Sequence, residues 1–164
     1  MNTIIKRIAA IFIIGSTIVG CKKEAFNGLS DVRPPIPVTV TNAIDYRSDP
    51  TVAASKSAGG NIQIVLAIPT ASGRTIKEIT KVAASTTYSA IQSTGSSGFY
   101  TSGPIAVNNT TATFNTTLAE YVTKGPGVLP SATNNELAKR FYFLLTLDDG
   151  SVIIPQPVRV LYLD

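Results

Sequence analysis

Few residues in this chain could carry out chemistry, and the most distinctive is Cys21, the only cysteine among 164 residues. The chain contains no histidine. A Ser-His-Asp triad, a Cys-His pair and the usual zinc sites need histidine or several cysteines, so these chemistries are excluded. Two carboxylates would suffice for glycoside hydrolysis, but only 10 acidic residues are present and several lie at expected turns. The sequence therefore predicts a protein that is not an enzyme.

A segment rich in glycine and serine, Ser93–Gly103, contains the adjacent aromatic residues Phe99 and Tyr100. Aromatic faces stack on sugar rings, and binding residues often lie in loops that a rigid scaffold positions. Phe99 and Tyr100 are therefore the candidate ligand-binding residues. In the simpler interpretation, one ring points into the core at the start of a strand and the other lies on the surface.

Two pairs of aspartates could contribute to a cation site: Asp45 with Asp49, and Asp148 with Asp149. Calcium takes about six to eight oxygen ligands, which neither pair approaches. Aspartate is also a common turn residue, and turn formation explains both pairs. We therefore expect no metal ion and no cofactor.

The N-terminus has the order of a secretory signal. Lys6 and Arg7 precede an apolar run that begins at Ile8 and continues less strictly to Val19. This run is shorter than the ~20 apolar residues that a bilayer-spanning helix needs, so a permanent span is the weaker interpretation. Residues 1–20 are therefore expected to be removed as a signal peptide.

The sequence Ile18-Val19-Gly20-Cys21 resembles the lipobox of bacterial lipoproteins, in which a small residue precedes an invariant cysteine. The resemblance implies that the Cys21 thiol receives a diacylglycerol and that Cys21 becomes the first residue of the mature protein. Two or more acyl chains hold a protein firmly on a bilayer without a transmembrane helix. The lipid at Cys21 is thus the only covalent group that we expect, and the membrane is the first expected partner. In the alternative interpretation, the chain is a secreted protein without a lipid anchor, and the cysteine in its signal occurs by chance.

Removal of the signal also changes the charge balance. The whole chain has a formal net charge of +4, and the loss of Lys6 and Arg7 lowers it to +2 on the side chains of the mature protein. No run of basic residues with interleaved aromatics is present, so nucleic acid is not an expected partner. With Cys21 lipidated, the mature chain can form no internal disulfide, and the core must hold the fold by itself.

Residues 21–36 are expected to form a tether that separates the domain from the membrane. Three of the four residues at 34–37 are proline, which favours an extended backbone and prevents a helix. The domain is then expected to extend from residue 37 to residue 164.

Short apolar runs separated by turn residues follow the tether, and several have the two-residue alternation of β-strands. The clearest is Asn61–Ile68, whose isoleucines and Leu66 fall on one face. Further short strands are expected at 37–42, 86–91, 104–107 and 110–115, the last with Ala112 and Phe114 pointing inward.

The segment Thr75–Val82 is ambiguous. Ile76, Ile79 and Val82 recur every three residues, as they would on a helix. The β-branched content and the preceding Ser-Gly pair favour a strand instead, and we expect one here.

One short helix is expected at Thr117–Thr123. Thr117 and Glu120 have the spacing of a capping box, in which a hydroxyl and a carboxylate satisfy each other's backbone amides. The sequence Gly125-Pro126-Gly127 is expected to end this helix.

A hairpin is expected to close the chain. The apolar runs Arg140–Leu147 and Ser151–Ile154 flank Asp148-Asp149-Gly150, and Asp149-Gly150 is typical of a two-residue type I′ turn. Prolines at 155 and 157 favour a sheet edge or a bulge before the strand resumes at 158–163.

About seven short strands, turns at short spacing and a final hairpin predict an all-β fold. We expect a single immunoglobulin-like β-sandwich with one short helix. An up-and-down barrel is the alternative, although the helix suits a crossover between two sheets better.

The export signal with Cys21-Lys22-Lys23-Glu24 and the closing segment Leu147–Val160 resemble small surface lipoproteins of Bacteroidota. Many of these have immunoglobulin-like domains and lie near Sus-type glycan-uptake systems. The resemblance covers about a third of the chain. It implies residence in the outer membrane, because the residue after Cys21 is not the aspartate associated with retention in the inner membrane. Two bases and one acid after Cys21 depart from the acid-rich run that directs such proteins to the cell surface, so the face of the membrane stays open.

These observations predict an outer-membrane-anchored lipoprotein that acts as a non-catalytic binding or accessory module, for example in the capture of a glycan or another nutrient. The alternative is a structural or interaction subunit of a cell-envelope complex. Exposed aromatics that converge on one face would favour the first function. A long unpaired edge strand or a contiguous apolar patch of several hundred Å² would favour the second.

Overall fold

The computed structural model describes residues 34–46, 48–94, 99–125, 129 and 135–163, which all belong to the unit Arg33–Asp164. The predicted signal peptide, Cys21 and the predicted tether up to residue 33 lie outside them. Ile36, the last residue of the predicted tether, already packs against the core. Within the described residues the chain is mostly β-strand, which confirms the predicted all-β class.

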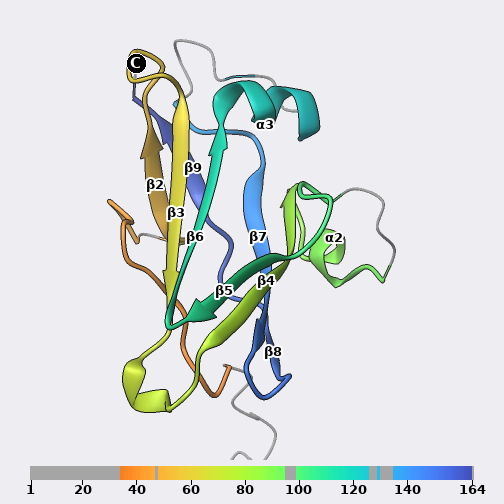
Figure 1. The fold of residues 1–164 in the computed structure, drawn as a ribbon. Coiled ribbons are helices and arrows are strands. Elements are labelled where there is room, and N and C mark those ends of the chain that lie inside the picture. Colours follow the sequence, from red (N-terminus) through yellow and green to blue (C-terminus); the bar gives the residue numbers. More distant parts are fainter. Residues whose placement is uncertain (1–33, 47, 95–98, 126–128, 130–134, 164) are drawn as a thin grey trace, which may run out of the picture. The chain divides into compact units, whose positions relative to one another are not determined.

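Three sheets build the fold (Figure 1). The first is antiparallel and has the order β1 (Thr39–Val40), β3 (Asn61–Ala67) and β6 (Thr111–Thr117). The second is the parallel pair β2 (Thr51–Ala54) and β9 (Arg159–Tyr162). The third is antiparallel, with the order β5 (Ile105–Asn109), β4 (Ile76–Ser85), β7 (Arg140–Leu147) and β8 (Val152–Ile153). The helical segments are η2 (Thr70–Ser72), α2 (Ser89–Gln92) and α3 (Leu118–Lys124).

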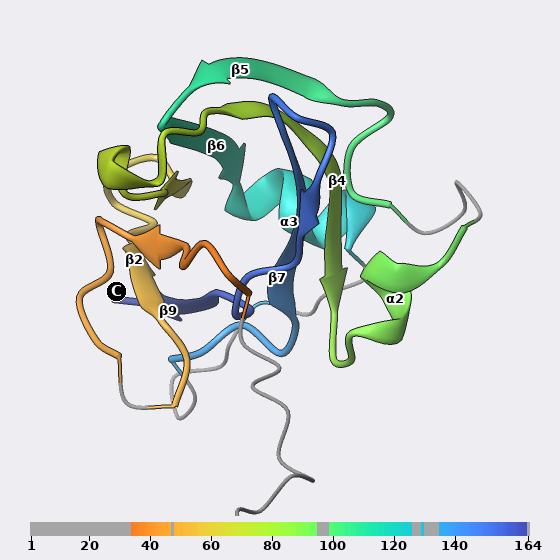
Figure 2. The same ribbon diagram turned by 90° about the horizontal axis from the view of Figure 1, so that it is seen from below.

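The parallel pair joins the first sheet to the third along one side of the sandwich, which we call the closed side. β2 lies against β3 and pairs with β9 (Figure 2). Val158, the residue before β9, pairs with Phe141 of β7 through two backbone hydrogen bonds of 2.9 and 2.8 Å. On the other side, β5 pairs with β4 and continues into β6 after Thr110, but in the described residues β6 is not paired with β4 or β5, and we call this the open side. β2 was not predicted, because its sequence Thr-Val-Ala-Ala is mostly buried and shows no alternation.

The core lies between the first and third sheets. The predicted inward face of β3 is confirmed, since Ile62, Ile64 and Leu66 are fully buried. Ala112 and Phe114 of β6 point inward as expected. Opposite them, the alternating residues of β7 supply Phe141, Phe143 and further apolar side chains. Apolar residues recur at every second position in these strands because only one face of each strand is buried.

The three-residue periodicity of β4 comes from two irregularities in a strand. Its register against β7 shifts between Ile76 and Glu78 and again between Ile79 and Lys81. Each bulge inserts one extra residue, so apolar side chains three positions apart return to the same face. Ile76, Ile79 and Val82 are all fully buried. The predicted strand is confirmed, and the helix-like spacing has a physical reason.

The strand expected at 86–91 is wrong. β4 ends at Ser85, and the chain then turns into the short helix α2. Local hydroxyl contacts, such as Thr87 Oγ1 to Ser89 Oγ at 2.7 Å, compete with strand pairing here. The turn also buries Ile91 in a small cluster with Ala83 and Tyr142 on the outer face of the third sheet. Burial of Ile91 therefore outweighs the β propensity of the two threonines.

The predicted helix and its cap are confirmed at α3. The Thr117 hydroxyl accepts a hydrogen bond from the Glu120 amide at 3.1 Å, and Gly125 follows the last helical residue. In the parts of the chain that the structure describes, no helix is both long and apolar enough to cross a bilayer.

The closing hairpin is confirmed, but its turn is not the expected type I′. Only Gly150 has a positive φ, of 82°, whereas a type I′ turn requires a positive φ at Asp149 as well. The Gly150 amide donates to the Leu147 carbonyl, and the Leu147 amide donates to the Ser151 carbonyl. This is a three-residue loop with a glycine bulge. Asp149 accepts from the Ser151 amide and hydroxyl, at 2.9 and 2.6 Å, which stabilises the longer loop.

Candidate functional site

Tyr100 is part of the core, which corrects its proposed role as a ligand-stacking residue. Its side chain is 5% exposed. The ring makes edge-on contacts with Phe141 and Phe114, at centroid distances of 5.2 and 6.0 Å. Its hydroxyl lies 2.7 Å from Thr116 Oγ1. A ring that is buried in this way has no open face on which a sugar could stack. Its burial is favourable because an aromatic side chain removes a large apolar surface from water.

Phe99 is half-buried and lies under a cation. Lys81 Nζ is 4.7 Å from the centre of the Phe99 ring. Phe99 and Tyr100 therefore do not converge on one binding surface. The simpler interpretation of this segment describes both rings better, with Tyr100 in the core and Phe99 nearer the surface.

Tyr100 instead fills the open side of the sandwich. Its backbone amide donates to the Val82 carbonyl of β4 at 2.7 Å, while its hydroxyl meets Thr116 of β6. Thr116 Oγ1 also lies 2.7 Å from a carboxylate oxygen of Glu120 on α3. The hydrogen bond from Thr116 lowers the pKa of Glu120, and burial raises the pKa of Tyr100. This chain of hydroxyls and a carboxylate joins β4, β6 and α3.

Three of the four aspartates, Asp49, Asp148 and Asp149, form ion pairs with arginine. Asp49 lies 2.8 Å from the Arg140 guanidinium. At the hairpin, Asp149 and Asp148 lie 3.0 and 3.8 Å from Arg74. A group of three or more potential metal ligands is absent from the residues placed by the structure. Pairing with arginine accounts for Asp49, Asp148 and Asp149.

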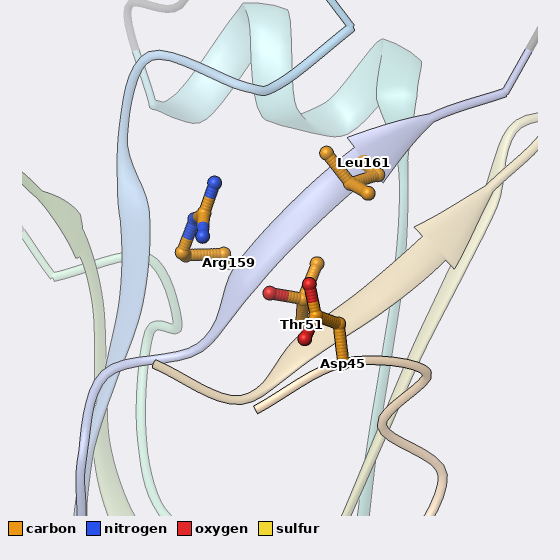
Figure 3. A pocket seen from close by; sticks show the side chains of 4 residues that line it. All are labelled: Asp45, Thr51, Arg159 and Leu161. Atoms are coloured by element: carbon orange, nitrogen blue, oxygen red, sulfur yellow. The ribbon is translucent and has the colours of Figure 1, made fainter. Parts of the chain in front are cut away.

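A shallow pocket of about 390 Å³ lies on the closed side and is lined by Asp45, Thr51, Arg159 and Leu161 (Figure 3). Arg159 and Leu161 alternate on β9, so both project from the same face of that strand. Parallel pairing places Thr51 opposite Arg159. The Thr51 amide donates to the Asp45 carbonyl at 2.8 Å, which brings the preceding loop onto the same surface.

Arg159 is held in place by Glu136. Its Nε donates to one carboxylate oxygen of Glu136 at 2.8 Å, and its Nη2 donates to the other. The two side chains are 21% and 30% exposed. The hydrogen bond from Arg159 lowers the pKa of Glu136, and the same pair raises the pKa of Arg159. A two-point pair of this kind fixes the plane of the guanidinium.

The loop beside the pocket is pinned by two arginines and is strained. Arg140 holds Asp49, and Arg159 Nη1 lies 3.5 Å from Ser48 Oγ. Ser48 has a φ of 145°, a region that residues with a side chain rarely adopt. Such strain persists only where surrounding contacts enforce it, and it is concentrated at functional sites. The loop is therefore preorganised rather than loosely attached.

The sequence gives little sign of this pocket. Asp45 and Asp49 stand out only as turn residues, and Arg159 is one polar position in an alternating strand. Ser48 and Arg159 are 111 positions apart, and they meet only because β2 and β9 pair in parallel. The pocket could be predicted only if β2 and its parallel pairing with β9 were predicted first.

Comparison with known proteins finds no matching family model, no similar curated protein and no similar solved structure.

Proposed function

We propose that this chain is a lipid-anchored, non-catalytic binding module of the outer membrane that captures a neutral, polyhydroxylated ligand such as a glycan at the closed-side pocket. The lipobox at Ile18–Cys21 supports the anchor. The pocket beside β9 carries the binding role, because it combines fixed hydrogen-bonding groups with an apolar side chain in one concave site.

The composition of the pocket suits sugar hydroxyl groups. A hydroxyl both donates and accepts, so it can bridge a carboxylate such as Asp45 and a guanidinium such as Arg159. Leu161 supplies an apolar patch for the C–H groups of a ring. Because Glu136 and Ser48 fix the guanidinium, little side-chain entropy is lost when a ligand binds.

The local charge disfavours an anionic ligand. Among the residues that the structure describes, three carboxylates (Asp45, Asp49 and Glu136) and two guanidiniums (Arg140 and Arg159) lie in or beside the pocket. An anion would approach an excess of negative charge, whereas a neutral ligand pays no such penalty. The pocket therefore fits a neutral glycan better than an acidic one.

Three acidic groups of the domain, Glu120, Glu136 and Asp149, are better suited to accepting hydrogen bonds than to acid catalysis. A general acid for glycoside cleavage needs a raised pKa. The pKa of Glu136 is lowered by the hydrogen bond from Arg159, and the pKa values of Glu120 and Asp149 are lowered by hydroxyl hydrogen bonds. Carboxylates that stay ionised are acceptors for hydroxyl groups, which supports a non-catalytic role.

We also propose that the sandwich is immunoglobulin-like. The order β1-β3-β6 in one sheet and β5-β4-β7 in the other matches an A-B-E and C′-C-F arrangement. Strands β8 and β9 then together take the place of strand G, because β8 pairs with β7 and Val158, just before β9, forms a bridge with Phe141 of β7. In such folds, binding loops are displayed by a rigid core, which agrees with the pinned loop beside the pocket.

A printed array of neutral and acidic glycans, probed with the mature chain in detergent, tests the binding proposal. We expect neutral glycans to be retained, and Asp45→Asn to weaken their binding by about tenfold or more, the cost of one charge-assisted hydrogen bond. Asp148→Asn, at the hairpin, is the matched control and should bind like the wild type. Retention of acidic glycans alone, or binding that Asp45→Asn leaves unchanged, would contradict the proposal.

A second function, as an interaction subunit of the cell envelope, is favoured by one observation. β6 is a seven-residue strand at the end of its sheet.

A further inference from the structure

The strand edges of the sandwich are unequally protected. In the described chain, the first sheet ends at β1 and β6, and the third sheet ends at β5 and β8. β1 and β8 are two residues long, and prolines at 155 and 157 follow β8. The pairing of β5 with β4 is interrupted by a bulge. Short strands, prolines and bulges are the usual means of preventing edge-to-edge pairing.

β6 has none of these protections. Its sequence Thr-Ala-Thr-Phe-Asn-Thr-Thr contains no charged residue and no proline. Its seven residues pair with β3 in a continuous register without a bulge. An edge of this length and regularity is a template for a further strand.

The backbone of β6 directs alternate residues to its open edge. The Thr110 carbonyl accepts from the Ile68 amide, and the Leu118 amide donates to the Gly60 carbonyl, both across to the β3 side. In an antiparallel pair, every second residue turns both of its backbone groups toward the same neighbour. The even-numbered residues of β6 therefore face β3, and the backbone groups of Thr111, Thr113 and Asn115 face away from it.

The outward side chains of the two strands at this edge are also uncharged. The outward residues of β3 and β6 are asparagine, glutamine, threonine, valine and alanine. Gln63 Nε2 donates to Asn115 Oδ1 at 3.2 Å across the two strands. The Tyr100 ring lies on the inner side of β6, since it meets Thr116, whose side chain is buried. Tyr100 thus fills the interior on the open side, while Thr111, Thr113 and Asn115 of β6 are exposed.

We propose that β6 pairs with β6 of a second copy of this chain, antiparallel and about a twofold axis at Phe114. A twofold axis there places Thr113 opposite Asn115 of the other copy, and Thr111 opposite Thr117. Positions 113 and 115 have their backbone groups facing the partner, as a hydrogen-bonded pair requires. The two three-stranded sheets then form one continuous sheet of six strands.

The chemistry of the strand selects a second copy as the partner. A symmetric interface brings each patch against itself, so any charged residue would lie near a like charge. β6 and the outer residues of β3 contain no charged side chain. The cross-strand pairs formed by self-association are threonine with asparagine and threonine with threonine, which hydrogen-bond well on a sheet surface.

Sedimentation of the full mature chain in density-matched detergent tests this interface with three variants. The wild type should sediment as a dimer. Thr113→Lys/Asn115→Lys places lysine opposite lysine at both pairs and should yield a monomer. Thr113→Lys/Asn115→Glu places lysine opposite glutamate and should stay dimeric. Gln63→Lys, on the same face but one strand from the edge, is the control and should also stay dimeric.

The substituted side chains are all exposed, so unchanged thermal melts are expected and would show that the variants fold. A wild-type chain that sediments as a monomer would overturn the proposal, as would a dimer that Thr113→Lys/Asn115→Lys leaves intact. Loss of the dimer in Thr113→Lys/Asn115→Glu would overturn the pairing of position 113 with position 115.

Discussion

The two sides of the sandwich are closed by different means. On the closed side, strands β2 and β9 pair in parallel and connect the two main sheets through backbone hydrogen bonds. On the open side, one aromatic side chain, Tyr100, spans the distance between β4 and β6. The closed side has the Arg159–Glu136 ion pair beside a pocket, whereas the outward side chains of β6 on the open side are uncharged.

This difference shows how the means of closure determines what the surface can do. Where backbone pairing holds the sheets together, the outward side chains of β9 are free to build a polar site. Where a side chain fills the gap, no strand covers the neighbouring edge, and its backbone groups face outward. The closed side is therefore suited to a small ligand, and the open side to another strand.

The largest effect is expected from removing the ring that fills the open side. Tyr100→Ala should lower the free energy of unfolding by about 3–5 kcal/mol, as is usual when a buried aromatic residue is truncated. Phe99→Ala is the neighbouring control and should have a much smaller effect, because Phe99 is only half-buried. Chemical denaturation of the mature chain measures both. Equal losses for the two variants would mean that Tyr100 has no special role in closing the sandwich.

A smaller effect is expected from breaking the ion pair of the closed side. Arg159→Ala removes a partly buried two-point contact with Glu136 and should cost about 1–2 kcal/mol at neutral pH. Gln63→Ala, on the uncharged face, is the matched control and should change stability by less than about 0.5 kcal/mol. Thermal melts of both variants at neutral pH give the comparison.

Acid should remove the effect of Arg159→Ala. The pKa of Glu136 is lowered in the folded state by the hydrogen bond from Arg159, from an ordinary value of 4.5. A lowered carboxyl pKa contributes stability above the unfolded value and loses it as the pH falls through the folded value. The melting temperatures of wild type and Arg159→Ala should therefore converge as the pH drops below 4.5. A difference that stays constant down to about pH 3 would contradict this assignment.

The strands with one buried face could be predicted from the sequence, and the features that depend on distant pairing could not. Ile62, Ile64 and Leu66 alternate because β3 buries one face, and this pattern is local. The three-residue spacing in β4 is also local, but it resembles a helix because two bulges interrupt the strand. Tyr100 gave a wrong site prediction, since an aromatic residue in a glycine-rich segment looks the same whether it binds a ligand or fills the core.

The candidate site itself depended on tertiary structure. Thr51 and Arg159 lie near opposite ends of the domain and meet only in the parallel pair. Parallel pairing leaves no turn signal between its strands, unlike the Asp-Gly turn of the closing hairpin. Arg159 therefore could not be distinguished from an ordinary exposed strand residue before β2 was known.

The proposed lipid anchor at Cys21 is tested most directly by metabolic labelling with a radiolabelled fatty acid. The wild-type chain should incorporate label and fractionate with membranes. Cys21→Ser should lose the label and appear in the soluble fraction, because no other cysteine can accept the lipid. A Cys21→Ser chain that keeps its label, or a wild-type chain that carries none, would contradict the account.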